Sequence, residues 1–170
     1  MPDEGMKGQP RETGAVSLTT HSKVVFCLPV WRKPDPATVD SLAASLPLLE
    51  EAGYEHGLAQ IVDMPYISAA RATTLRAAMD AKADIVVFID YDLSWRPRDL
   101  LRLIEARGDV VAGTYRAKIE PETYMGTIET NADNTPKVRD DGCIYAKLIP
   151  AGFLKLTNAA VDSFMTAYPE

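Results

Sequence analysis

Two aspartates, Asp90 and Asp92, directly follow the most apolar run of the chain, residues 85–89. Such a run predicts a buried parallel strand, and open α/β sheets bind ligands at the carboxyl ends of these strands. Side chains alternate along an extended backbone, so we expect both carboxylates to point to the same side. Hard divalent cations such as Mg²⁺ and Mn²⁺ favour carboxylates together with substrate phosphates. The spacing therefore suggests a metal that holds a diphosphate; a solvated turn, where aspartate is common, is the alternative.

The elements that must position this motif alternate between strands and helices. Apolar, β-branched runs of strand length predict the strands, and apolar residues at helical spacing fill the segments between them. This βαβαβαβ order implies a single α/β domain with a mainly parallel central sheet and right-handed crossovers. The predicted strands lie near residues 24–30, 58–62, 85–89 and 109–113.

Several residues predict where the helices begin and end. Asp35 followed by proline predicts an N-cap, and Gly53 a helix end. Pro47 lies inside that helix and predicts a kink or a shortening. Ser68 is the expected N-cap of the next, alanine-rich helix, which runs to about Ala81.

The pattern changes after the fourth strand. Residues 115–150 contain no clear helix, and extended pieces near 124–130 and 143–149 flank a turn-rich stretch at 131–142, which predicts a β-hairpin or meander. We expect the loops at 64–67 and 131–142 to order on ligand binding. A last helix is predicted from Asn158, with an apolar face of Val161, Phe164, Met165 and Tyr168.

Composition limits the function classes. The chain has 170 residues, of which 46% are hydrophobic and 25% charged, enough for one core. A net charge of −6 argues against a general nucleic-acid binder. Cys27, in an apolar strand, and Cys143, in a turn, suggest neither a disulfide framework nor a zinc site. Residues 1–22 are predicted to be a disordered tail ahead of one domain over 23–170. No run reaches the ~20 apolar residues of a membrane span, so we expect a cytoplasmic protein.

Taken in order, these segments resemble the family 2 glycosyltransferases, which have the GT-A fold and use nucleotide-sugar donors. The similarity covers roughly residues 23–165 and rests on the order and spacing of its parts. These parts are the first strand (24–30), a helix start ending in Ala-Arg (67–71) and the strand with the Asp-x-Asp motif (83–92). The fourth strand with its Gly-Thr-Tyr exit (109–115) and an Ala-Gly-Phe segment (151–153) follow.

The resemblance implies roles for the Asp-x-Asp residues. Asp92 would coordinate a divalent cation, Mn²⁺ or Mg²⁺, that bridges the diphosphate of a UDP- or GDP-sugar. Asp90 would support this metal or bind the donor ribose, and Tyr91 belongs to the same donor site. The metal and carboxylates would stabilise charge on the departing nucleoside diphosphate.

The resemblance also implies a nucleoside pocket. Pro29, Val30 and Trp31 would line it at the exit of the first strand, and Asp63 would contact the base after the second. Arg71 would reach the nucleotide or hold the Asp-x-Asp loop. From the residues alone, Arg71 could instead pair with Asp90 or Asp63. Trp31 could be a packing residue or a platform for the acceptor, and Asp63 could only start a turn.

The sequence departs from the family at two points. Ala72 stands where many members carry asparagine, and no residue matches the motif of the catalytic base that deprotonates the acceptor hydroxyl. The carboxylates available for that role are Glu120, Glu122, Asp140, Asp141 and Asp162. Arg116 and Lys118 could face a phosphate or be solvated loop charges.

The resemblance thus implies a metal-dependent glycosyltransferase of the hexosyltransferase type, acting on an unknown acceptor. Two other readings stay open. A nucleotidyltransferase has a similar sheet, although it would want a glycine-rich basic loop after the first strand, where residues 28–33 are basic without glycine. A truncated or non-catalytic nucleotide-sugar-binding relative is the other.

Overall fold

A five-stranded mixed sheet forms the centre of the computed structural model, which describes residues 22–169. Its order is β2-β1-β3-β7-β4. The predicted tail at 1–22 lies outside the described residues except for its last position. The strands of this sheet are β1 (Lys23–Val30), β2 (Glu55–Val62), β3 (Ile85–Ile89), β4 (Val110–Ala112) and β7 (Phe153–Thr157).

Four of the five strands run in the same direction. β1 pairs in parallel with both β2 and β3, while β7 lies antiparallel between β3 and β4. The prediction of a mainly parallel α/β sheet is therefore confirmed. Strand β7 was not predicted, because its sequence Phe-Leu-Lys-Leu-Thr is short and carries Lys155 in the middle.

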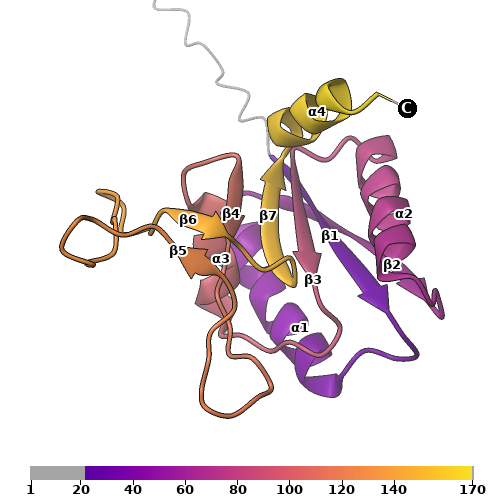
Figure 1. The fold of residues 1–170 in the computed structure, drawn as a ribbon. Coiled ribbons are helices and arrows are strands. Elements are labelled where there is room, and N and C mark those ends of the chain that lie inside the picture. The colour runs from indigo at the N-terminus through magenta and orange to yellow at the C-terminus, as the bar shows by residue number, and fades with distance from the viewer. Residues whose placement is uncertain (1–21, 170) are drawn as a thin grey trace, which may run out of the picture.

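Helices cover both faces of the sheet, so the domain has three layers (Figure 1). On one face α1 (Pro36–Glu51) and α3 (Pro97–Glu105) bury Leu49 and Leu100 against alternate residues of β1 and β3. On the other, α2 (Ile67–Asp80) packs Ala78 against the intervening strand residues. Strand alternation thus divides the apolar runs between two cores. Of the helices described, none is long and apolar enough to cross a membrane.

The helix boundaries confirm some predictions and correct others. Asp35 caps α1 by accepting a hydrogen bond from the Ala37 amide at 2.8 Å, and Gly53 follows the helix with a φ of 83°. Pro47 does not shorten α1, which continues to Glu51, because Pro47 lies on the exposed side. Ser68 is not an N-cap: α2 begins one residue earlier, after Tyr66, with no side-chain cap.

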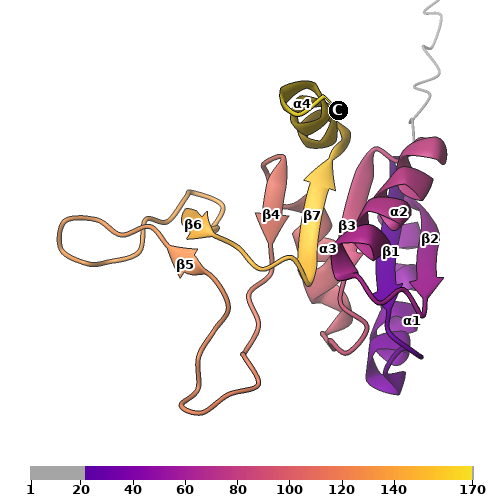
Figure 2. The ribbon, with the colours of Figure 1, turned by 45° about the vertical axis from the view of Figure 1, so that its right-hand side comes forward.

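Residues 114–150 form an arm that extends away from the sheet (Figures 1 and 2). It contains the short antiparallel pair β5 (Thr127–Ile128) and β6 (Ala146–Leu148), so the predicted hairpin is confirmed. Many of its large apolar side chains are exposed, in contrast to those of the sheet. They are Ile119, Tyr124, Met125, Ile128, Val138, Ile144, Tyr145, Leu148 and Ile149.

The last helix, α4 (Asn158–Ala167), begins where predicted and packs against β7. Its N-cap is Thr157, whose hydroxyl accepts from the Ala160 amide at 3.3 Å. Only Val161 of the predicted apolar face is buried. The prediction is wrong for the other three residues, which are exposed because the described chain places no element over that side: Phe164, Met165 and Tyr168.

Candidate functional site

One edge of the sheet collects the loops that follow β1, β2, β3 and β4 and the loop that precedes β7. Backbone hydrogen bonds hold these loops together. The Asp63 amide donates to the Val30 carbonyl at 3.1 Å, and the Asp90 amide to the Gly152 carbonyl at 2.8 Å. This is the edge where open α/β sheets bind their ligands, because the parallel strands all end there.

The Asp-x-Asp segment lies at this edge, but in a different conformation from the one predicted. Strand β3 ends at Ile89, and Tyr91 and Asp92 lie in a turn in which the Leu93 amide donates to the Asp90 carbonyl at 3.3 Å. The expectation of an extended backbone with alternating side chains is therefore wrong here. The two carboxylates instead meet different cationic side chains.

Asp90 is held by Arg71 from the first turns of α2. The Arg71 Nη2 donates to the Asp90 Oδ1 at 2.9 Å, and the two side chains are 29% and 32% exposed. Within the described chain, the buried Nε of Arg71 has no hydrogen-bond partner. The pairing with a nearby aspartate, one of the two readings of Arg71, is thus present, while a free donor remains on the same guanidinium.

Gly152 and Tyr115 complete the surroundings of Asp90. A Cβ atom at position 152 would overlap both the Asp90 carboxylate and the Tyr115 hydroxyl, so only glycine fits between them. Partial burial raises the pKa of Tyr115, and the negative charge of Asp90 raises it further. Asp90 is therefore enclosed by groups from α2, the loop before β7 and the loop after β4, and has little freedom to move.

Asp92 has a more open environment. Its Oδ2 accepts from the Lys118 Nζ at 2.6 Å, and the side chains are 40% and 78% exposed. The hydrogen bond to Asp92, followed by its charge, raises the pKa of Lys118. A hollow of about 350 Å³ lies next to this pair and is lined by Arg116, Ala117, Lys118, Ile119 and Glu120.

The residues expected at the nucleoside and donor site differ in how exposed they are. Pro29 and Val30 are buried, Val30 in the core beneath α1 and α3, and Tyr91 packs against that same core. Trp31 is 49% exposed, and Asp63 is exposed with a φ of 60° just after β2. Of these five, Trp31 and Asp63 are exposed and Tyr91 is half-buried.

Few side chains are available as ligands for a metal ion. Among residues 22–169 no group of three or more His, Cys, Asp or Glu side chains could hold an ion. Asp92 nevertheless fits a hard cation that takes its remaining ligands from a diphosphate, because its carboxylate is exposed and its partner is a flexible lysine. Asp90 fits less well, since its carboxylate is enclosed by Arg71, Gly152 and Tyr115.

The five carboxylates considered as catalytic bases are dispersed. Glu120 borders the hollow beside Lys118 and pairs with Arg116 at 2.7 Å, and Glu122 accepts from the Tyr124 hydroxyl at 3.0 Å. The other three lie elsewhere on the molecule. Asp140 and Asp141 pair with Arg107 near the end of α3, and Asp162 is on α4.

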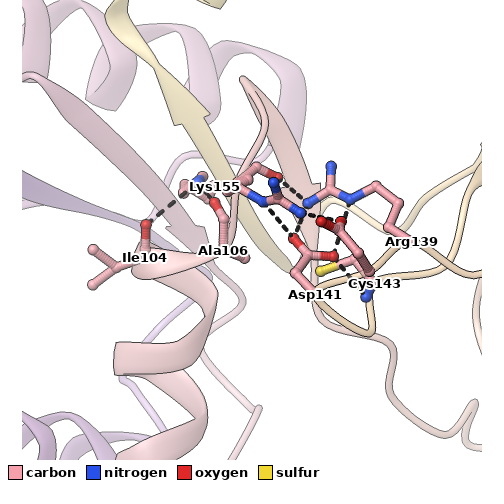
Figure 3. Close-up of polar contacts among 8 residues, drawn as sticks. Ile104, Ala106, Arg139, Asp141, Cys143 and Lys155 are labelled. Atoms are coloured by element: carbon pink, nitrogen blue, oxygen red, sulfur yellow. Dashed lines mark hydrogen bonds and ion pairs between the residues drawn. The ribbon is translucent and has the colours of Figure 1, made fainter.

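A second polar cluster joins the arm to the end of α3 (Figure 3). Lys155 of β7 is buried and donates to the carbonyls of Ile104 and Ala106. Burial lowers the pKa of Lys155. On the arm, Arg139 pairs with Asp141. Sequence reasoning missed Lys155; the only signal was a lysine between apolar residues in a short extended run.

The two cysteines, Cys27 and Cys143, are free thiols. Cys27 is buried in β1 and donates to the Thr74 carbonyl at 3.3 Å, and burial raises its pKa to about 12. Cys143 is half-buried in the arm next to Asp141, which accepts from its amide at 3.0 Å. Neither thiol belongs to the edge that carries Asp90 and Asp92.

Comparisons with known proteins do not add to this geometry. No model of a protein family matches the sequence, and neither the curated proteins nor the solved structures contain a significant match. The function is therefore argued from the site itself.

Proposed function

We propose that this chain is a nucleotide-sugar-binding glycosyltransferase domain of the GT-A type, which holds a nucleoside diphosphate sugar through a divalent cation at Asp92. The observation that carries the proposal is an exposed carboxylate at the ligand-binding edge of a mainly parallel sheet, beside a hollow that contains basic side chains. Such an edge, with a few convergent polar groups, is where α/β proteins bind nucleotides.

Each residue of the edge would have a distinct task. Asp92 would hold the cation, and Arg71, which donates to Asp90, would keep Asp90 and the turn in place. Trp31 and Asp63, exposed at the ends of β1 and β2, would contact the nucleoside. When bound, the cation would offset the charge that develops on the leaving diphosphate.

A nucleotidyltransferase is less well supported. That reading needs a helix N-terminus after β1 that is free to bind phosphate through its amides. In this chain the Asp35 carboxylate already accepts from the Ala37 amide at the start of α1 and places a negative charge there. A phosphate at that helix end would meet electrostatic repulsion.

Binding without transfer is the second candidate function. The observation that favours it is the dispersal of the possible bases: of the five, Glu120 alone borders the hollow, and it is paired with Arg116. Donor binding with no hydrolysis or transfer of the sugar to any acceptor tested would support this alternative.

The test is calorimetric titration of UDP and of GDP, each with Mn²⁺ and with EDTA. Asp92→Asn should weaken metal-dependent binding by roughly tenfold or more, because a charge-assisted ligand is lost while the fold is kept. Asp80→Asn is the matched control, since Asp80 is an exposed carboxylate paired with Arg76 near the C-terminal end of α2. Unchanged metal-dependent binding by Asp92→Asn would show that the metal assignment is wrong.

A further inference from the structure

Lys118 connects the arm to the Asp-x-Asp turn. It lies on a loop that is closed by a bridge between Arg116 and Tyr124 and by a hydrogen bond from the Met125 amide to the Tyr115 carbonyl at 2.9 Å. From this loop its Nζ reaches Asp92 at 2.6 Å. The position that a divalent cation would occupy on the open carboxylate is therefore taken by an ammonium group of the chain itself.

Arg71 and Lys118 hold the two aspartates in different ways. Arg71 is mostly buried, and its Nη2 donates to Asp90 from the first turns of α2. Lys118 is 78% exposed on a flexible four-carbon stem, so its pair with Asp92 is easily broken. The pair at Asp90 is suited to a permanent contact, and the pair at Asp92 to an exchangeable one.

An ammonium group and a divalent cation compete for the same carboxylate. Whichever is bound, the other must find a different partner, because Asp92 cannot neutralise both at short range. A diphosphate supplies that partner, since lysine binds phosphate oxygens well as a point charge. The hollow lined by residues 116–120 is next to this position, and in it Arg116 is paired with Glu120 at 2.7 Å.

We infer that Lys118 is a displaceable counter-ion of the donor site: it occupies Asp92 when no cation is bound and contacts the diphosphate once a cation takes its place. This inference rests on the proposed function. It assigns to Lys118 two opposite effects, since the side chain weakens cation binding to the empty site and strengthens nucleotide binding.

The experiment compares the full chain with its Lys118→Met variant in two titrations. Mn²⁺ without nucleotide, followed by electron paramagnetic resonance of the free ion, should bind about two- to fivefold more tightly to Lys118→Met, because the competing ion pair is gone. UDP in saturating Mn²⁺, followed by calorimetry, should bind about tenfold more weakly, because a charge-assisted phosphate contact is lost.

Lys137→Met is the control. It removes the same charge from another exposed pair on the arm, with Glu129 at 3.0 Å, and should change neither titration. If the parent binds Mn²⁺ and UDP but Lys118→Met alters neither affinity, or weakens both, the counter-ion role is wrong and the proposed function stands. If the parent, folded by circular dichroism, binds neither, both the proposed function and this inference are overturned.

Discussion

The sheet and the arm both contain large apolar side chains but place them in opposite ways. In β1 and β3 nearly every apolar residue is buried, whereas in residues 114–150 large apolar side chains from Ile119 to Ile149 are exposed. A two-stranded pair such as β5 and β6 is marginal on its own, because it has no second layer to cover it. Most of the stability therefore comes from the sheet and its helices, and the arm depends on a few polar contacts at its base.

The largest expected effect comes from replacing one leucine that packs against the sheet and one leucine of the arm. Leu100 lies on α3 and is buried against the sheet. Leu100→Ala should lower the free energy of unfolding by about 2–5 kcal/mol, because it leaves a cavity. Leu148→Ala, on β6 and 67% exposed, should change it by less than about 0.5 kcal/mol. Urea unfolding followed by circular dichroism measures both.

A large cost for Leu148→Ala would contradict the comparison. It would mean that the arm packs against another surface in solution, such as a partner or a second copy of the chain. Sedimentation at two protein concentrations would then separate self-association from a contact within one molecule.

The junction between the two regions gives a smaller effect. Gly152→Ala should destabilise the protein by about 1–3 kcal/mol, because its Cβ overlaps Asp90 and Tyr115, and Asp90 is tied to Arg71. Gly57→Ala in β2 is the matched control, since its Cβ would meet the nearest atom, in Val25, at 3.7 Å. Thermal unfolding of the two variants tests this; equal melting temperatures would show that the edge is looser than its packing indicates.

The same two regions differ in how far the sequence predicts them. Long apolar runs specified β1 and β3, because each buries both of its faces and leaves no room for polar residues. Local chemistry specified the start of α1, since Asp35 needs only the neighbouring Ala37 amide to act as a cap. Elements that depend on strong burial, or on contacts between neighbours in the chain, can therefore be predicted from the sequence.

What could not be predicted depends on contacts between distant segments. Strand β7 is inserted between β3 and β4, and its Lys155 is satisfied by carbonyls at the end of α3, some fifty positions earlier in the chain. The pair of Asp92 with Lys118 likewise spans 26 positions. The sequence identified Asp90 and Asp92 as candidates and offered Asp90 as one possible partner of Arg71, and that pair is present. The contact of Lys118 with Asp92, and so the different freedom of the two carboxylates, follows only from the fold.

The smallest effect concerns the base of the arm. Asp141 accepts from Arg139 and from the Cys143 amide, and these contacts hold its pKa below the ordinary value of 3.8. Because the pKa is lowered in the closed arm, the contact contributes fully above that value and is lost as the pH falls through the lowered pKa. Asp141→Asn should therefore leave global unfolding nearly unchanged and speed hydrogen exchange at residues 139–145.

Acidification of the parent toward pH 3 and below should progressively produce the same local loosening, once exchange rates are corrected for their intrinsic pH dependence. Asp133→Asn is the control, because Asp133 accepts hydrogen bonds within its own turn, from Thr135 at the tip of the arm. Exchange at 139–145 that responds equally to both substitutions would mean that the arm loosens as one body. Exchange that responds only to Asp141→Asn would locate its attachment at the end of α3, and would leave the Lys118 contact with Asp92 as a separate, exchangeable link to the sheet.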